Sequence, residues 1–168
     1  VDEGKKRWPI AGVYEDGWAS IAAQCCTIGN EGVDPESCRR TKDGITTSTD
    51  QCVAGLSVDG RIEELTYGQA KAKCTDAGLA MCRQSCAFKG CAYNKHPVYT
   101  SIPCPSSPPP SPPSSDLPSI PTGGVLVYRG DSEESVGCLM PDVDEGKKRW
   151  PIAGVYEDGW ASIAAQCC

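Results

Sequence analysis

Residues 1–26 read VDEGKKRWPIAGVYEDGWASIAAQCC, and the same letters return without a change at residues 143–168, an offset of 142 residues. Self-similarity at a fixed period indicates a repeat architecture, and this period is longer than that of a solenoid unit. Its length suits one complete domain followed by a linker. The sequence therefore predicts a tandem array of beads on a string, seen through a window that begins inside one domain and ends inside the next.

The linker of this array is predicted at residues 103–121, which read PCPSSPPPSPPSSDLPSIP. Proline fixes φ near −65° and lacks an N–H donor, so this stretch favours an extended polyproline II rod of about 3.1 Å per residue. The predicted domain organisation follows from its position. Residues 1–102 form the C-terminal part of one cysteine-rich repeat domain, and residues 122–168 form the N-terminal part of the next.

Cysteine usage indicates the compartment and the fold class. Two of the twelve cysteines, Cys167 and Cys168, belong to the second copy of the repeated segment, and an even ten belong to one period: Cys25, Cys26, Cys38, Cys52, Cys74, Cys82, Cys86, Cys91, Cys104 and Cys138. Such a density favours disulfides in an oxidising, extracellular compartment, each adding about 2–4 kcal/mol of stability. We therefore expect a small, loop-rich, disulfide-rich α+β domain, whose cysteine pairing stays open at this point.

Charge and hydropathy argue against two classes of partner. The net charge is −6 and the acidic residues are spread along the chain, which argues against a nucleic-acid partner. No apolar run approaches the roughly 20 residues that a membrane-spanning helix needs. With the cysteine density, which indicates an extracellular compartment, this leads us to expect a secreted chain.

The clearest predicted element is a helix within residues 64–82, ELTYGQAKAKCTDAGLAMC. Thr66 and Gln69 have the spacing of a capping box, in which each side chain satisfies the other residue's backbone N–H. Leu65 and Ala70 occupy the two positions of a hydrophobic staple around it. The sequence therefore predicts where this helix begins.

Other elements are predicted from shorter patterns. Gly78 is suited to end the helix, and residues 79–82 are then expected to enter the core as a short strand. The β-rich run at 125–130, VLVYRG, predicts another strand. Apolar residues at helical spacing predict a second helix from Trp18 to Cys25. Residues 5–14 contain a proline and a glycine, and are expected to be irregular.

One group of residues has some of the features of a metal site. Cys82, Cys86 and Cys91 follow C-x3-C-x4-C spacing, and His96 lies close behind them. Structural zinc sites more often show paired C-x2-4-C knuckles. Because the cysteine count is also even, we expect disulfides and neither a metal nor a cofactor.

Catalytic chemistry is not expected. His96 has no nucleophile motif around it, and the adjacent acidic pairs Glu15-Asp16 and Glu63-Glu64 are typical of caps or solvated surface. Residues 5–8, KKRW, are either a patch for an anionic glycan or a solvated run beside a half-buried tryptophan. The chain is therefore expected not to be an enzyme.

Two stretches resemble known families. The order TYGQAKAKC, GLAMC, GCAYN, PVYTSIPC over residues 66–104 resembles a cysteine-rich module repeated in extracellular proteins of algae, and SSPPPSPPSS resembles the hydroxyproline-rich glycoproteins of the extensin and pherophorin kind. The second resemblance implies hydroxylated, O-glycosylated linker residues. These candidates are Pro105, Pro108, Pro109, Pro110, Pro112, Pro113, Pro118 and Pro121, with Ser106, Ser107, Ser111 and Ser114.

A weaker resemblance links the stretch TYGQAKAKCTDAGLAMC to the first helix of C-type-lectin-like and link modules. Their Glu-Pro-Asn, Gln-Pro-Asp and Trp-Asn-Asp signatures for calcium and sugar are missing from this sequence. Calcium-dependent sugar binding is therefore not expected, even where the fold is shared.

These observations predict a structural repeat glycoprotein of an extracellular fibril, sheath or flagellar hair, with neighbouring repeats and covalent O-glycans as its partners. The alternative is a multivalent glycan-binding or adhesion module, for which aromatic residues should gather on one exposed face: Trp8, Tyr14, Trp18, Tyr93 and Tyr99. We expect residues 122–168 to pack against the 27–104 region of the next unit, with a strand at 125–129 and with Cys138 bridged in the same bead. Either one continuous chain or strand donation between subunits would produce this packing.

Overall fold

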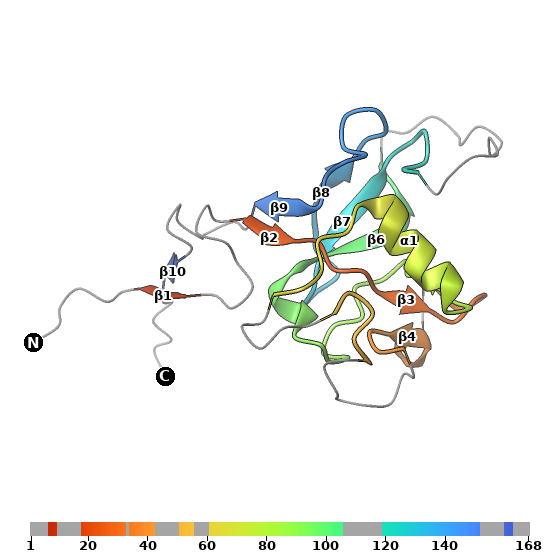
Figure 1. Cartoon of the computed structure of the whole chain (residues 1–168), viewed down its shortest axis with the longest axis horizontal. Coiled ribbons are helices and arrows are strands. Elements are labelled where there is room, and N and C mark those ends of the chain that lie inside the picture. The colour runs from red at the N-terminus through yellow and green to blue at the C-terminus, as the bar shows by residue number, and fades with distance from the viewer. Residues whose placement is uncertain are drawn as a thin grey trace, which may run out of the picture.

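A computed structural model describes residues 7–9, 18–32, 34–42, 51–55, 61–105, 119–151 and 160–162. Its elements in chain order are β1 (Arg7–Pro9), β2 (Trp18–Ser20), β3 (Cys25–Cys26), η1 (Pro35–Ser37), β4 (Cys38–Arg39), α1 (Tyr67–Asp76), β5 (Ala80–Met81), η3 (Tyr93–Lys95), β6 (Pro97–Pro103), β7 (Val125–Arg129), β8 (Ser135–Leu139), β9 (Arg149–Pro151) and β10 (Trp160–Ser162). We call the described residues of 18–105 and 119–151 the bead. Figure 1 shows the bead on the right, with β1 and β10 outside it on the left.

The bead contains two three-stranded antiparallel sheets and the two-stranded antiparallel pair of β2 with β9. One three-stranded sheet has the order β6-β7-β8, and the other has the order β4-β3-β5. A parallel bridge between Ala22 and Val98 connects the segment after β2 to β6. With one α-helix and short strands among the described residues, the structure is that of a small, disulfide-rich domain of mixed helix and strand, as the sequence predicts.

Helix α1 begins and ends where the sequence predicts. The Thr66 side chain accepts from the Gln69 N–H, and the Gln69 side chain accepts from the Thr66 N–H, which completes the capping box. At the other end Gly78 has a φ of +70°, and Leu79 N–H donates to Cys74 C=O at 2.8 Å. This is a Schellman arrangement, which glycine favours because a left-handed φ carries no Cβ penalty there.

The hydrophobic core takes residues from both sides of the Pro/Ser segment. Ile120, Val125, Val127 and Leu139 are 3% exposed or less and belong to the same buried cluster as Val98. β7 pairs along β6 and β8, so the predicted strand at 125–129 is confirmed. Within this chain, the sequence on either side of residues 106–118 therefore packs into one bead, whereas the sequence analysis assigned residues 1–102 and 122–168 to successive domains.

The predicted helix from Trp18 to Cys25 is wrong. This segment holds β2 and β3 instead, and every residue from Ala19 to Cys26 is buried. A helix buries one face, whereas this segment is covered on all sides by β9, β6, β4 and β5. The expectation of irregular structure over residues 5–14 is also wrong at Arg7–Pro9, which forms β1.

Five disulfides cross-link the bead, and the expectation of a disulfide-rich domain is confirmed. Cys25 and Cys26 point to opposite faces of β3, as neighbours in a strand do, and bond to different partners. The pairs are Cys25–Cys74, Cys26–Cys82, Cys38–Cys86, Cys52–Cys91 and Cys104–Cys138. Cys167 and Cys168 lie outside the described residues.

The bead extends into both ends of the segment 103–121. β6 runs to Pro103, and Ile120 is 3% exposed in the core. The two described candidates for modification, Pro105 and Pro121, are exposed. The other candidates lie outside the described residues, as does the predicted polyproline II rod: Ser106, Ser107, Pro108, Pro109, Pro110, Ser111, Pro112, Pro113, Ser114 and Pro118.

Candidate functional site

The contact between residues 18–105 and residues 119–151, which we call the seam, closes the bead. Its backbone part is the pairing of β6 with β7, and its covalent part is the disulfide between Cys104 and Cys138. Gly124 turns the chain into β7 with a φ of +74°. A Cβ on Gly124 would lie 2.9 Å from the Cys104 sulfur, so only glycine fits this turn. The end of β6, the turn and the disulfide are thereby held together.

A buried arginine crosses the seam. Arg40 is 1% exposed, and its guanidinium donates to Ser85 C=O at 2.9 Å, to Gly130 C=O at 2.6 Å and to the Asn94 side chain. It also lies 5.7 Å from the centre of the Tyr93 ring. Burial lowers the pKa of Arg40 to about 10, which leaves it charged at neutral pH. One cation therefore ties together loops from both sides of the Pro/Ser segment.

Tyr99 on β6 makes a second polar tie. Its hydroxyl oxygen lies 2.7 Å from the Leu65 carbonyl oxygen and 2.9 Å from that of Lys147. The ring packs edge-on against Tyr67. Burial raises the pKa of both phenols, that of Tyr67 to about 12, so both stay protonated and able to donate.

Two strand pairs in the structure are formed by the two copies of the repeated segment. In the bead, β2 of the first copy pairs antiparallel with β9 of the second, and outside it β1 of the first copy pairs with β10 of the second. Both pairs join the sequence Arg-Trp-Pro to the sequence Trp-Ala-Ser. Ser20 faces Arg149 in one, and Ser162 faces Arg7 in the other, so the register is the same. We call these two pairs the joint.

Trp150 fixes β9 against the bead. A Cβ on Gly137 of β8 would collide with the Trp150 ring, which shows how closely the ring lies on this glycine. Lys147 Nζ lies 4.3 Å from the ring centre, and Ile21 N–H donates to Lys148 C=O at 2.8 Å. Beside Trp150 is a cavity of about 110 Å³, which is below the usual size of a small-molecule site.

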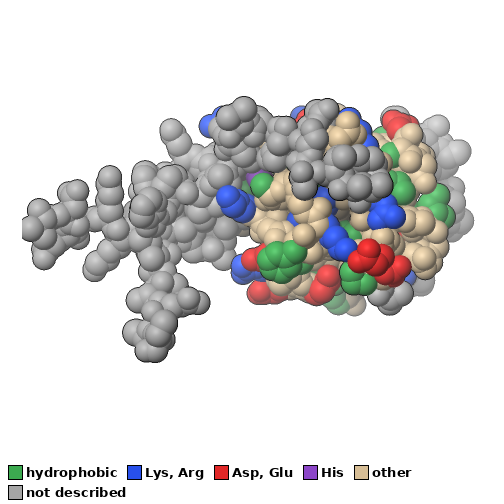
Figure 2. Space-filling view, turned by 90° about the horizontal axis from the view of Figure 1, so that it is seen from below, with side chains coloured by type: hydrophobic (Ala, Val, Ile, Leu, Met, Phe, Trp, Pro, Cys, Tyr) green, Lys and Arg blue, Asp and Glu red, His purple; other side chains and the backbone are tan. Residues whose placement is uncertain are grey.

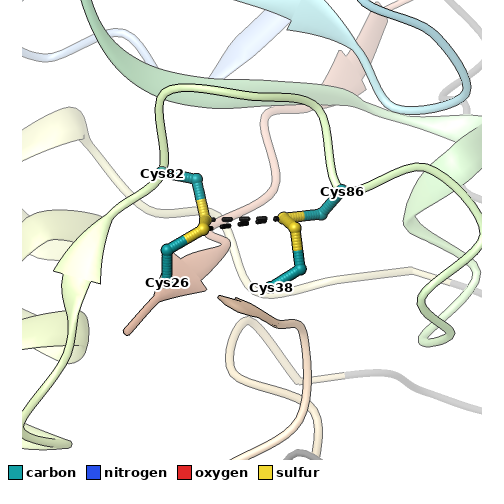
Figure 3. A group of neighbouring side chains, drawn as sticks. All are labelled: Cys26, Cys38, Cys82 and Cys86. Atoms are coloured by element: carbon teal, nitrogen blue, oxygen red, sulfur yellow. Dashed lines mark hydrogen bonds between the residues drawn. A yellow bond between two sulfur atoms is a disulfide. The ribbon is translucent and has the colours of Figure 1, made fainter. Parts of the chain in front are cut away.

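Four cysteines form a buried cluster of two adjacent disulfides, Cys26–Cys82 and Cys38–Cys86 (Figure 3). The Cys82 and Cys86 sulfurs are 3.4 Å apart, and the Cys26 and Cys86 sulfurs are 3.9 Å apart. Four thiolates around zinc would be separated by about 3.8 Å, which follows from a Zn–S distance of about 2.3 Å. The reduced cluster thus has the ligands of a structural zinc site, whereas the disulfides offer no thiolate to a metal.

The structure separates the residues that the sequence grouped as a possible zinc site. Cys91 bonds to Cys52, and His96 Nδ1 lies 3.1 Å from the Ser20 carbonyl oxygen. Tyr93 and Tyr99 are both 0% exposed, so they form no exposed aromatic face. The side chains of Trp8, Tyr14 and Trp18 lie outside the described residues.

The described surface mixes charges of both signs. Figure 2 shows basic and acidic side chains interspersed on one face of the bead. Arg129 binds Asp131 at 2.9 Å, and this contact lowers the pKa of the Asp131 carboxyl. None of the helices among the described residues has the length and apolar character of a membrane span.

Comparison with protein-family models, with curated proteins and with solved structures finds no match to this chain. The functional assignment therefore rests on the molecule's own geometry. Sequence reasoning found the repeat and the cysteines that close the bead, but it missed Arg40. An arginine that directly follows another arginine, Arg39, carries no sequence signal of burial.

Proposed function

We propose that this chain is a structural repeat glycoprotein of an extracellular fibril, sheath or flagellar hair. In this proposal, disulfide-linked beads assemble head-to-tail, and an O-glycosylated polyproline II segment joins the two parts of each bead in the sequence. The observation that carries it is the 142-residue offset between two identical segments, taken with a bead that closes across the Pro/Ser segment. The repeating unit of the sequence is then one bead together with the Pro/Ser segment that joins its two parts.

The five disulfides support an extracellular setting, because such cross-links persist in oxidising compartments. They also suit a mechanical role, since they hold the loops of a bead whose strands are short. The net charge of −6 supports the absence of nucleic acid among the partners. The resemblance of the sequence to algal cysteine-rich modules and to hydroxyproline-rich linkers is a further part of this proposal.

The proposed chain is not an enzyme and needs no cofactor. The single histidine, His96, is 2% exposed and engaged with the Ser20 carbonyl, which leaves it poorly placed for proton transfer to a substrate. The alternative of a glycan-binding module loses support because Tyr93 and Tyr99 are core residues.

Peptide mass spectrometry of the chain purified from its source tests the proposal. We expect hydroxyproline and pentose-containing glycans on peptides that cover residues 105–121. The matched control in the same sample is Pro97 or Pro103, which lie in β6 and should remain unmodified. Unmodified prolines throughout 105–121 would overturn the glycoprotein assignment.

A further inference from the structure

The joint has an arrangement that a simple hairpin would not produce. Each copy of the repeated segment contains both strands of the pair, Arg-Trp-Pro and then Trp-Ala-Ser, separated by eight residues. A hairpin within one copy would pair Arg7–Pro9 with Trp18–Ser20. The structure instead pairs each strand with the other copy.

Each copy places one strand in the bead and one outside it, and the two copies place opposite strands in the bead. From the first copy, β2 lies in the bead and β1 lies outside it (Figure 1). From the second copy, β9 lies in the bead and β10 lies outside it. Each copy therefore gives one strand to the bead and keeps one strand for a partner of the same kind.

We propose that the repeated 26-residue segment is a strand-exchange connector between beads. Each copy gives its Trp-Ala-Ser strand to one bead and its Arg-Trp-Pro strand to the neighbouring one. The partner is a second copy of the same segment, in the next repeat or in another molecule. This inference rests on the proposed head-to-tail assembly and names the contact that produces it.

The equal register explains why one copy can replace another. Ser20 faces Arg149 and Ser162 faces Arg7, so the exchanged pair has the same sequence partners as the pair in the bead. Between copies that offer the same contacts, the choice of partner depends on which copy is locally more concentrated. In the present structure the outer strands β1 and β10 close on each other within one chain.

The bead pair has contacts that favour exchange into a bead. Trp150 lies on Gly137, and Ile21 N–H bonds to Lys148 C=O, so β9 is held by side chain and backbone. Arg149 Nε also lies 3.9 Å from a Glu64 carboxylate oxygen. Because an Arg-Trp-Pro strand of one copy pairs with a Trp-Ala-Ser strand of another, the contact is heterologous and extends in one direction without closing.

The test uses two full-length variants that each block one outer strand. Trp8→Pro blocks β1 and leaves β10 free, and Ala161→Pro blocks β10 and leaves β1 free, because proline removes a ladder donor. Neither variant can pair its own two outer strands. A mixture of the two variants offers one free Arg-Trp-Pro strand and one free Trp-Ala-Ser strand. Asp2→Pro is the matched control, since it adds proline to the same tail outside β1.

Analytical ultracentrifugation of a concentration series, with a fluorescent label on one variant, gives the readout. We expect each blocked variant alone to be monomeric and the equimolar mixture to contain heterodimers of twice that mass. A three-residue pair is short, so the expected dissociation constant is on the order of 0.1–1 mM. The Asp2→Pro chain should associate as the unaltered chain does.

Two results would overturn the inference. One is a mixture that stays monomeric over the whole series, and the other is equal self-association of the blocked variants and the unaltered chain, which would place the contact elsewhere. The mass of the fully oxidised bead checks that each variant has folded. If the blocked variants do not associate, the modification of residues 105–121 can still be detected by mass spectrometry. The inference and the proposed function can therefore fail independently.

Discussion

Arg40 shows how a charged residue can be part of a core this small. Its side chain is 1% exposed, and burial of a cation is costly unless hydrogen bonds replace its water. Three carbonyls and the Asn94 amide oxygen supply these bonds, with the Tyr93 ring alongside. The residue thereby orients three loops that have little regular structure of their own.

Substitution of Arg40 by methionine should therefore be severe. The carbonyls of Ser85 and Gly130 lose a charged donor, and we expect the free energy of unfolding to fall by about 3 kcal/mol. Arg39→Met is the matched control, because Arg39 is half-buried and bonds only to nearby carbonyls; its effect should stay under about 1 kcal/mol. Urea unfolding with disulfides intact measures both, and equal losses would contradict the role of Arg40.

The four-cysteine cluster makes a different prediction at the residue scale. In a Cys38→Ser variant the released Cys86 thiol lies 3.4 Å from the Cys82 sulfur and 3.9 Å from that of Cys26. Its thiolate can attack the Cys26–Cys82 disulfide, form a new bond to one sulfur and release the other as a thiolate. We expect alkylation and peptide mapping to find the free thiol shared among Cys26, Cys82 and Cys86.

The control for thiol exchange is Cys52→Ser, which releases Cys91. Cys91 lies outside the group of sulfurs that approach one another within 4.8 Å. The free thiol of this variant should therefore map to Cys91 alone. A Cys38→Ser variant that is alkylated only at Cys86 would show that the two neighbouring disulfides do not exchange.

At the scale of elements, prediction from sequence succeeded where local signals agree with the fold. The Thr66–Gln69 capping box and Gly78 marked both ends of α1, and 125–130 marked β7, because caps, turns and β-branched runs act locally. The segment from Trp18 to Cys25 misled for the opposite reason. Its helical spacing of apolar residues is overridden by burial on all sides and by pairing with distant strands.

The capping box gives a testable prediction for α1. Thr66→Ala removes the acceptor for Gln69 N–H, and we expect a loss of about 1 kcal/mol in the free energy of unfolding. Thr75→Ala is the matched control, since Thr75 is exposed and alanine favours a helix, so its effect should stay within about 0.5 kcal/mol. Equal shifts in the two urea midpoints would contradict a capping role.

The pairing of cysteines and the seam could not be predicted from sequence. Ten cysteines allow many connectivities, and the spacing along the chain does not order them. The partners Cys52 and Cys91, for example, are 39 residues apart and meet only after the loops between them have packed. The seam likewise depends on Arg40 and Tyr99, whose burial follows from tertiary contacts that no local pattern contains.

At the scale of the whole molecule, the bead is closed by residues on both sides of the Pro/Ser segment. Cys104 and Cys138 are 34 residues apart, and residues 106–118 lie between them in the chain. A single chain therefore carries both halves of one bead. The disulfide across the seam should contribute about 3–4 kcal/mol by the loop-entropy estimate for a loop of this length.

Cleavage within residues 106–118 tests whether the seam joins halves of one molecule. A single protease site placed there should yield two fragments that migrate together without reductant and separate with it, because Cys104–Cys138 still links them. The uncleaved chain should run as a monomer without reductant, whereas covalent multimers would show that this disulfide joins different chains.

A chain carrying both Cys104→Ser and Cys138→Ser provides the control. After cleavage its halves should stay together in native buffer, held by β6–β7 pairing and by Arg40 at Gly130, and should separate in urea without any reductant. Halves that part in native buffer would show that the disulfide alone holds the seam, and that its hydrogen bonds and buried side chains contribute too little to close the bead.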